Sequence, residues 1–291
     1  MAEILRIFPR RTKATPDDPM VIIGDPPLFR PDADEVHVSV TFTYDCKEGE
    51  RLKRSYEDYY PVVKIGGPGM GDPGGEFISG RYLKPGYVIT SRGCPNKCWF
   101  CDVWRREGGI RELPITEGWN VLDDNLLACS ESHILDVFNM LAHQPHRSAF
   151  TGGLEAKRIT KEIARHLKHL NPKPIYTAYD SEDREGYIRR AGNILSDVGF
   201  NREILRCFVL VGYPKDKIEA ATLRLQAAYD AGFMPMAMLY RDHIGERDPV
   251  WTRFARSWTR PAAIKAMCKG IRICNKSQPL GIVGLDIRGK V

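Results

Sequence analysis

The sequence has no long run of apolar residues. No stretch approaches the ~18 residues that a membrane-spanning helix needs, and Met1-Ala2-Glu3-Ile4-Leu5-Arg6 lacks the pattern of a secretory signal peptide. We also find no internal repeat of fixed length and no long low-complexity tract. These absences argue against a membrane-spanning, secreted or solenoid protein, and we expect a cytoplasmic protein with no membrane partner.

A second C-x2-C pair is also missing, although the chain has eight cysteines. A structural zinc site normally takes four ligands from two paired clusters, so half of such a site is absent. Five of the cysteines are scattered and are expected to be buried free thiols in a reducing compartment. These five are Cys46, Cys129, Cys207, Cys268 and Cys274.

The other three cysteines, Cys94, Cys98 and Cys101, stand close together with the spacing C-x3-C-x2-C. Three thiolates at this spacing can hold three irons of a four-iron cluster and leave the fourth iron without a protein ligand. An open iron can bind a small molecule, so the motif predicts a reaction centre. A zinc site completed by a distant ligand, such as His37 or Cys129, is the alternative.

The surroundings of the cysteines favour a reaction centre. The run Tyr87 to Ser91 is β-branched and aromatic and predicts a buried strand just before them. The glycine, proline and asparagine that follow require irregular loop backbone. A loop at the carboxyl end of a strand is where α/β barrels place their chemistry.

Residues 1–80 are predicted to form a separate small α/β unit. Its strand candidates are Leu5–Phe8, Met20–Ile23, Glu35–Val40 and Pro61–Ile65. Between the last two, the polar run Lys47 to Tyr59 favours a helix and gives the order β-α-β. The glycine- and proline-rich stretch at 66–75 then predicts a loop or linker.

Residues 81–291 are predicted to form a second unit in which strands and helices alternate, as in a parallel sheet. Its strand candidates end at Ser91, Leu122, Phe150, Tyr176, Val211 and Tyr240. The segments between them show apolar stripes at helical spacing, such as Ile159, Ile163, Leu167 and Leu170. Farther along, Trp251, Phe254 and Trp258 stand at helical spacing beside arginines, which fits docking on the barrel or binding of nucleic acid.

The cysteine motif and its place after a first strand resemble the radical S-adenosylmethionine (radical SAM) superfamily. The resemblance covers roughly residues 80 to 245 and implies an α/β fold, a partial (βα)6 barrel with a small N-terminal extension. It also implies a [4Fe-4S] cluster held by the three cysteines, SAM on the open iron, and reductive cleavage of SAM to a 5′-deoxyadenosyl radical. A reductase such as flavodoxin or ferredoxin would supply the electron.

The resemblance also implies which residues bind SAM. Phe100 stands where the family carries an aromatic residue against the adenine, and Asp123 and Asp124 replace its Gly-Gly-Glu motif, as in methylthiotransferase and cobalamin-dependent branches. A turn with a helix N-cap is the other interpretation of the two aspartates. The remaining candidates for SAM binding are Gly152, Gly153, Glu155 and Gly212.

Polar residues at later strand ends are candidates for catalysis, because parallel barrels place their site residues there. These candidates are Asp180, Tyr240 and Arg241. For Arg241, the SAM carboxylate, an anionic substrate or a structural ion pair are open alternatives.

The N-terminal unit faintly resembles the cobalamin-binding domain of one radical SAM branch. It lacks the Asp-x-His-x-x-Gly sequence, and His37 has no such neighbours, so we expect no cobalamin.

For the substrate, the net charge of +6 and the arginine stripe favour a nucleobase or nucleotide-like molecule, free or within a nucleic acid. A small metabolite or peptide, a zinc-stabilised nucleic-acid-binding protein and a catalytically inactive SAM-binding scaffold remain alternatives.

Overall fold

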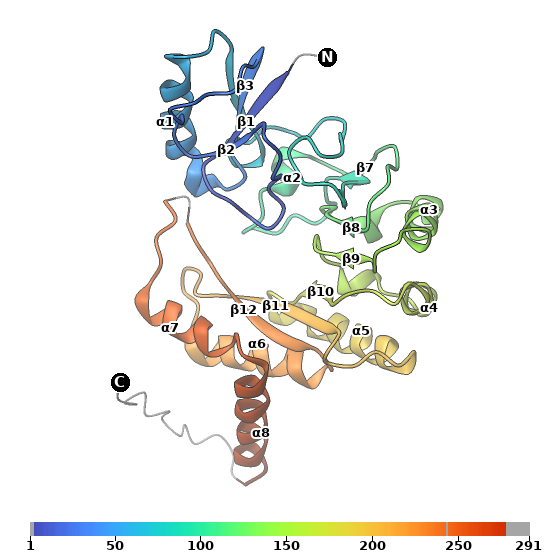
Figure 1. Ribbon diagram of the computed structural model, residues 1–291. Helices are drawn as coiled ribbons and strands as arrows, with labels where there is room; N and C mark the ends of the chain where they lie inside the picture. Colours follow the sequence, from blue (N-terminus) through green and yellow to red (C-terminus); the bar gives the residue numbers. More distant parts are fainter. Residues whose placement is uncertain (1–2, 243, 278–291) are drawn as a thin grey trace.

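The computed structural model describes residues 3–242 and 244–277 (Figure 1). The N-terminal unit contains a four-stranded parallel sheet in the order β2-β1-β3-β4. Its elements are β1 (Ile4–Phe8), β2 (Val21–Ile23), β3 (Glu35–Ser39), α1 (Cys46–Glu57) and β4 (Val63–Gly66). The predicted β-α-β order is confirmed, since α1 connects β3 to β4.

This small unit has its own hydrophobic core. Alternate residues of the strands, such as Leu5 and Val36, point inward and are fully buried. Leu52 and Tyr56 of α1 cover them. The core shares no residue with the cluster that fills the rest of the molecule.

The larger unit contains a six-stranded, wholly parallel sheet in the order β12-β11-β10-β9-β8-β5. Its strands are β5 (Tyr87–Val88), β8 (Asn120–Val121), β9 (Ala149–Phe150), β10 (Ile175–Ala178), β11 (Leu205–Val211) and β12 (Met234–Leu239). The helices that follow them are α3 (Glu131–Ala142), α4 (Lys161–Leu170), α5 (Glu185–Asp197), α6 (Ile218–Asp230), α7 (Pro249–Ser257) and α8 (Pro261–Ser277). Among the described residues the edge strands β5 and β12 do not pair, so the barrel is partial, as predicted.

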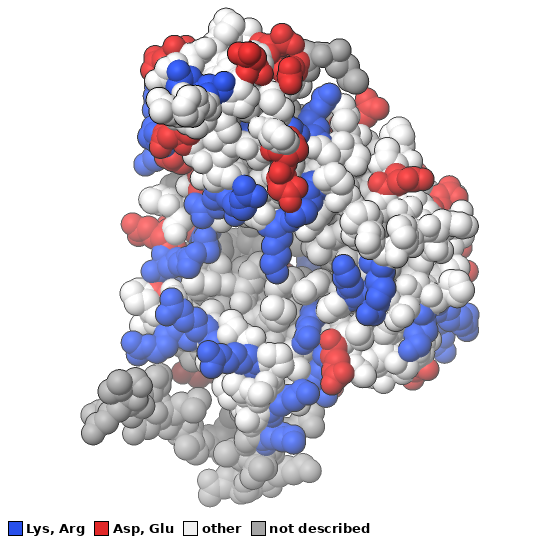
Figure 2. Space-filling view, in the orientation of Figure 1, with Lys and Arg blue, Asp and Glu red and all other residues white. Residues whose placement is uncertain are grey.

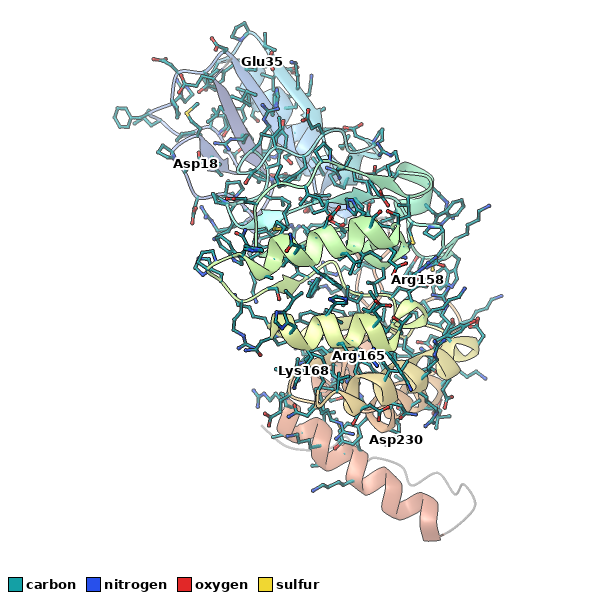
Figure 3. The ribbon with its side chains drawn as sticks, turned by 90° about the vertical axis from the view of Figure 1, so that its right-hand side faces the viewer. Asp18, Glu35, Arg158, Arg165, Lys168 and Asp230 are labelled. Carbon is teal, nitrogen blue, oxygen red and sulfur yellow. The ribbon has the colours of Figure 1, made fainter. Side chains whose placement is uncertain are left out.

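Helices α3 to α6 lie on the outer side of this sheet and bury its apolar face (Figure 1). Helix α4 is strongly amphipathic, because its apolar residues recur at the helical period: Ala164 and Leu167 are fully buried, while Arg165 and Lys168 are exposed (Figure 3). The inner side and the carboxyl edge of the strands therefore remain available for a site.

The predicted strand from Tyr87 to Ser91 is wrong in one respect, since it is divided. Only Tyr87 and Val88 pair with β8, and Ser91–Arg92 forms β6, which pairs in antiparallel fashion with β7 (Arg111–Glu112). The division arises at Thr90, because its N–H donates to the carboxylate of Asp123 (2.7 Å) instead of to a neighbouring strand.

Short helical turns connect several strands to their helices. They are α2 (Val103–Arg106) and the 3₁₀ turns η1 (Thr43–Asp45), η2 (Pro68–Met70), η3 (Leu126–Ala128), η4 (Ala156–Arg158) and η5 (Glu182–Arg184).

The aromatic stripe after β12 docks on the barrel. Trp258 is buried, and Trp251 and Phe254 pack against the main core. The neighbouring arginines of the stripe are exposed. Within the described residues, no helix has the length and apolar character needed to cross a membrane.

Candidate active site

The three cysteines lie in the loop between β6 and α2, on the side of the sheet where the strands end. Gly93 opens this loop with φ +90°, and a Cβ there would lie 2.1 Å from the carbonyl oxygen of Gly109. The loop is tied back by hydrogen bonds from the N–H of Cys94 to the oxygen of Gly108 (3.1 Å) and from Cys101 to Cys98 (3.2 Å). The thiols of all three cysteines are half-buried.

Two of the thiols accept hydrogen bonds from side chains in the segments that follow β8 and β10. Nδ2 of Asn125 lies 3.4 Å from Sγ of Cys94, and Nη2 of Arg184 lies 3.4 Å from Sγ of Cys98. Burial raises the pKa of Cys101, and the nearby thiols of Cys98 and Cys94 raise it further. The three sulfurs are therefore close enough to interact, and side-chain N–H groups of Asn125 and Arg184 point at two of them.

The three thiols do not converge on a single point: within 3–242 and 244–277, no three His, Cys, Asp or Glu side chains form a group that could hold one metal ion. In a four-iron cluster each cysteine binds a different iron, whereas zinc draws four ligands to about 2.0–2.3 Å of one point. His37 is bound to Tyr82 (2.5 Å) and Glu35 (2.8 Å) in the N-terminal unit and is not with the three thiols.

Asp123 anchors the base of the cysteine loop. Its buried carboxylate accepts hydrogen bonds from the N–H and hydroxyl of Thr90 and from the hydroxyl of Ser91, each at 2.7 Å. Burial raises the pKa of Asp123, and these hydrogen bonds oppose the shift. The side chain thus connects the end of β8 to the segment that leads into the cysteines.

Asp124 holds the same loop one step farther along. Its carboxylate accepts a hydrogen bond from the N–H of Gly93 (2.9 Å). Burial raises its pKa, against that hydrogen bond. Both aspartates lie just beyond β8, and their carboxylates bind different parts of the segment that leads into the cysteines.

Glu155 lies beside the cysteine loop, where three donors converge on its carboxylate. They are Nδ2 of Asn125 (2.8 Å), Nδ2 of Asn96 (2.9 Å) and Nε of Arg158 (2.8 Å). Burial alone would raise the pKa of Glu155, but these hydrogen bonds outweigh it and leave the pKa lowered. Glu155 is therefore an anion next to the cysteines.

A cavity of about 210 Å³ opens at Glu155. Asn96 of the cysteine loop lines it, together with Lys157 of η4, Ala178 of β10, Arg184 of η5 and Tyr187 of α5. The cavity combines carboxylate, amide, ammonium and guanidinium groups within reach of the loop. It can therefore bind a small molecule that carries charges of both signs.

Close backbone packing and a positive φ explain why two glycines, Gly152 and Gly153, follow β9. A Cβ on Gly152 would lie 2.2 Å from the carbonyl oxygen of Asp123, so the strands approach too closely for any side chain. Gly153 has φ +86°, a conformation that other residues rarely adopt.

Residues at the ends of β10 and β11 have structural partners. One carboxylate oxygen of Asp180 accepts a hydrogen bond from the N–H of Leu210 (3.0 Å), and burial raises its pKa. Gly212 has φ +75°, and a Cβ there would lie 2.8 Å from the ring of Trp251.

Aromatic side chains connect the cysteine loop to the far edge of the sheet. Trp99 is 54% exposed, and its ring lies 5.4 Å from that of Phe100, 5.4 Å from Tyr213 and 5.9 Å from Tyr240. Tyr213 and Tyr240 follow β11 and β12, so this contact spans the mouth of the partial barrel.

Arg241, next to Tyr240, faces the N-terminal unit instead. Its guanidinium lies 5.0 Å from the ring centroid of Tyr44. The segment after β12 rises to the N-terminal unit and returns to α7 (Figure 1). Arg241 therefore contacts the N-terminal unit, whereas Glu155 is held by residues of the larger unit.

Neither a protein-family profile nor a curated protein sequence matches the chain. Among solved structures, it is similar to the radical SAM methyltransferase TsrM from Kitasatospora setae, determined with cobalamin and a [4Fe-4S] cluster bound. The TM-score is 0.58 at 11% identity, over 81% of this chain and 74% of that chain. This chain has the radical SAM fold.

A second solved structure, coproporphyrinogen III oxidase (HemN) from Escherichia coli, which is a radical SAM enzyme, aligns over 55% of this chain and 41% of that chain. Its TM-score is 0.33 at 12% identity, and nothing below depends on it. The match to TsrM covers a larger share of the chain than residues 81–291 make up, so that likeness extends into the N-terminal unit.

Within the radical SAM fold, the structure brings the cysteines, Asp123, Asp124, Gly152, Gly153 and Glu155 to one end of the sheet. Sequence reasoning missed three residues there: Asn96, Asn125 and Arg184. The sequence offered two signals for these residues. Asn125 directly follows the two aspartates, and Arg184 stands in a charged run after β10.

Proposed function

We propose that the chain is a radical SAM enzyme in which Cys94, Cys98 and Cys101 hold three irons of a [4Fe-4S] cluster. The observation that carries the proposal is the position of these half-buried thiols in one loop at the carboxyl edge of a radical SAM fold. When bound, the cluster supplies the electron for reductive cleavage of SAM, which starts hydrogen abstraction from the substrate.

The cavity beside the cysteine loop is our candidate for the amino acid part of SAM. Glu155 supplies a carboxylate for an ammonium group, and Arg184 and Lys157 supply cations for a carboxylate. Asp123 and Asp124 are assigned to holding the loop, because hydrogen bonds to Thr90, Ser91 and Gly93 already engage their carboxylates. Gly152 and Gly153 allow the backbone to approach closely there.

The proposed substrate is a nucleobase or nucleotide-like molecule. Trp99 presents an exposed aromatic face at the mouth of the barrel, on which a planar base can stack. Lysines and arginines gather around a hollow between the two units (Figure 2), and the chain carries a net charge of +6. Both features favour a planar, anionic molecule.

The proposed electron donor is a flavodoxin or ferredoxin. The cysteine loop presents the exposed Lys97 at the surface, which suits an acidic donor. Seven described cysteines are free thiols, and a cluster with an open iron needs a reducing environment, so we infer a cytoplasmic location.

The experiment is anaerobic reconstitution with iron and sulfide, followed by SAM and dithionite, with 5′-deoxyadenosine measured by chromatography. Wild-type protein should absorb near roughly 400 nm, as such clusters do, and release 5′-deoxyadenosine. Cys98→Ser should abolish the release, while Cys46→Ser, a matched change whose Sγ–H donates to the oxygen of Gly69 outside the site, should leave it unchanged. A colourless protein with one tightly bound zinc would refute the proposal.

A further inference from the structure

The positive charge of the chain is concentrated in helices α7 and α8. Residues 249–277, called here the basic segment, contain seven lysines and arginines and no aspartate or glutamate, while the whole chain has a net charge of +6. The other residues taken together are therefore close to neutral. A charge distribution this uneven creates a local positive potential that attracts an anionic partner.

The exposed basic residues of the basic segment have no acidic partners. They are Arg253, Arg256, Arg260, Lys265 and Lys269. Among the side chains that the structure describes, no carboxylate lies within ion-pair distance of any of the five. Helix α5 differs, since its Arg189 pairs with Glu185 one turn earlier. The charges of the basic segment are therefore free to bind an external anion.

The arginines of α7 lie on the side of the helix that faces away from the barrel. Trp251 and Phe254 pack against the main core, and Trp258, just after the helix, is buried. Because successive helical residues are turned by about 100°, Arg253 and Arg256 stand roughly opposite these aromatic rings. Lysine and arginine side chains are visible over α7 and along the hollow above it (Figure 2).

The apolar side of the basic segment is already covered. Ile264 and Cys268 of α8 are 1% and 0% exposed and belong to the main core. A helix that lies in a membrane surface must insert a free apolar face. The exposed residues between the basic ones are instead small or polar: Ser257, Thr259, Ala262, Ala263 and Ala266. A partner bound through charge alone therefore fits better than a lipid surface.

The basic segment begins close to the mouth of the partial barrel. A Cβ on Gly212, which follows β11, would lie 2.8 Å from the ring of Trp251 in the first turn of α7. The next residue, Tyr213, contacts the exposed ring of Trp99, with 5.4 Å between centroids. Single-stranded nucleic acid combines regularly spaced phosphates with bases that stack on aromatic rings. It therefore matches unpaired cations that lie near an exposed aromatic side chain.

We propose that the basic segment binds the phosphate backbone of a single-stranded nucleic acid, and that the bound strand continues to Trp99 at the mouth of the barrel. The inference rests on the proposed function in taking the substrate to be a nucleobase, and it makes that base part of a polymer. Binding itself requires neither SAM nor reductant, so it is tested separately.

The test measures binding of the reconstituted full chain to a fluorescently labelled single-stranded RNA, by anisotropy, without SAM or reductant. Each phosphate contact to a single strand contributes about 0.7 to the salt dependence, so five contacts predict a slope of roughly −3.5 for log K against log salt concentration. The single strand should also bind more tightly than a duplex of the same sequence, because only unpaired bases can stack on Trp99.

Two double variants test the two helices of the basic segment. Arg253→Gln with Arg256→Gln removes the exposed charges of α7, and Lys265→Gln with Lys269→Gln removes those of α8. Each pair should weaken binding of the RNA about tenfold and make the salt slope shallower by roughly 1.4, since two phosphate contacts are lost.

The matched control is Lys161→Gln with Arg165→Gln in α4. Both residues are exposed and stand four positions apart, as Lys265 and Lys269 do, and Arg165 lies on the outer face of the barrel (Figure 3). This variant loses the same net charge at a different place. It should therefore bind the RNA as the wild type does.

Four results would overturn the proposal. They are an equal loss of RNA binding in the control variant, unchanged RNA binding in both test variants, binding of phosphatidylserine vesicles without binding of RNA, or binding of an acidic flavodoxin without binding of RNA. Any of these can occur while 5′-deoxyadenosine release is intact, and RNA binding can persist if that release fails, so the two proposals fail separately.

Discussion

The guanidinium of Arg184 donates a hydrogen bond to the sulfur of Cys98, with Nη2 and Sγ 3.4 Å apart. Hydrogen bonds and positive charges near a cluster sulfur stabilise the reduced cluster and raise its reduction potential. If Cys98 holds the proposed cluster, this contact would give Arg184 a role in setting the potential at which the cluster accepts an electron.

Arg184→Gln should lower the reduction potential of the reconstituted cluster by on the order of tens of millivolts, because a full positive charge is lost. A redox titration followed by electron paramagnetic resonance (EPR), without SAM, measures the shift. Arg189→Gln is the control, since Arg189 pairs with Glu185 on the surface of α5. A potential that stays the same or rises would contradict this role.

Asp123→Asn should reduce both stability and iron content. The buried carboxylate accepts three hydrogen bonds from Thr90 and Ser91, and an amide replaces one acceptor atom with a donor. Leaving a buried partner unsatisfied costs about 1–3 kcal/mol. Urea unfolding and iron analysis measure the two effects; the exposed Asp136→Asn should change neither. Full iron loading and an unchanged midpoint would refute the anchoring role.

Gly152→Ala should destabilise the protein, since the new Cβ would lie 2.2 Å from a backbone oxygen and the strand ends would have to separate. Overpacking of this kind costs about 1–3 kcal/mol. Gly186→Ala, in α5 with nothing within 4 Å, should instead stabilise by roughly 0.5–1 kcal/mol. Thermal unfolding compares them, and the expectation fails if the two variants shift in the same direction.

Glu107→Gln should weaken the connection between the glycine-rich linker and the cysteine loop. The side chain of Glu107 is fully buried and binds Arg106 (3.0 Å), Arg111 (2.8 Å) and the N–H of Gly74 (3.0 Å). Removing the charge leaves a buried guanidinium uncompensated, at a cost of about 3–5 kcal/mol. The free energy of urea unfolding measures it, with the exposed Glu117→Gln as control. Equal unfolding curves would show that Glu107 contributes nothing.

Local patterns predicted the partial barrel and the cysteine loop. Strands of β-branched residues alternating with amphipathic segments specify a parallel sheet, and the spacing of Cys94, Cys98 and Cys101 is itself local. Because carboxyl ends of parallel strands meet at one edge, polar residues such as Glu155 were also placed correctly at the end of their strand.

Contacts across long stretches of chain could not be predicted. Arg184 and Cys98 are 86 positions apart, and their contact depends on how η5 packs against the loop. Asp123 and Asp124 are neighbours of the same type in the sequence, yet in the fold one binds Thr90 and the other binds Gly93. No local sequence pattern predicts that Arg241 stacks on Tyr44, because Tyr44 belongs to the other unit.

The most direct test of the central claim is a count of iron and sulfide per reconstituted chain, combined with EPR of the reduced protein with and without SAM. The proposed site predicts about four irons per chain and a spectrum that changes when SAM is added, because SAM binds the open iron. One zinc per chain, or a cluster whose spectrum SAM leaves unchanged, would contradict it.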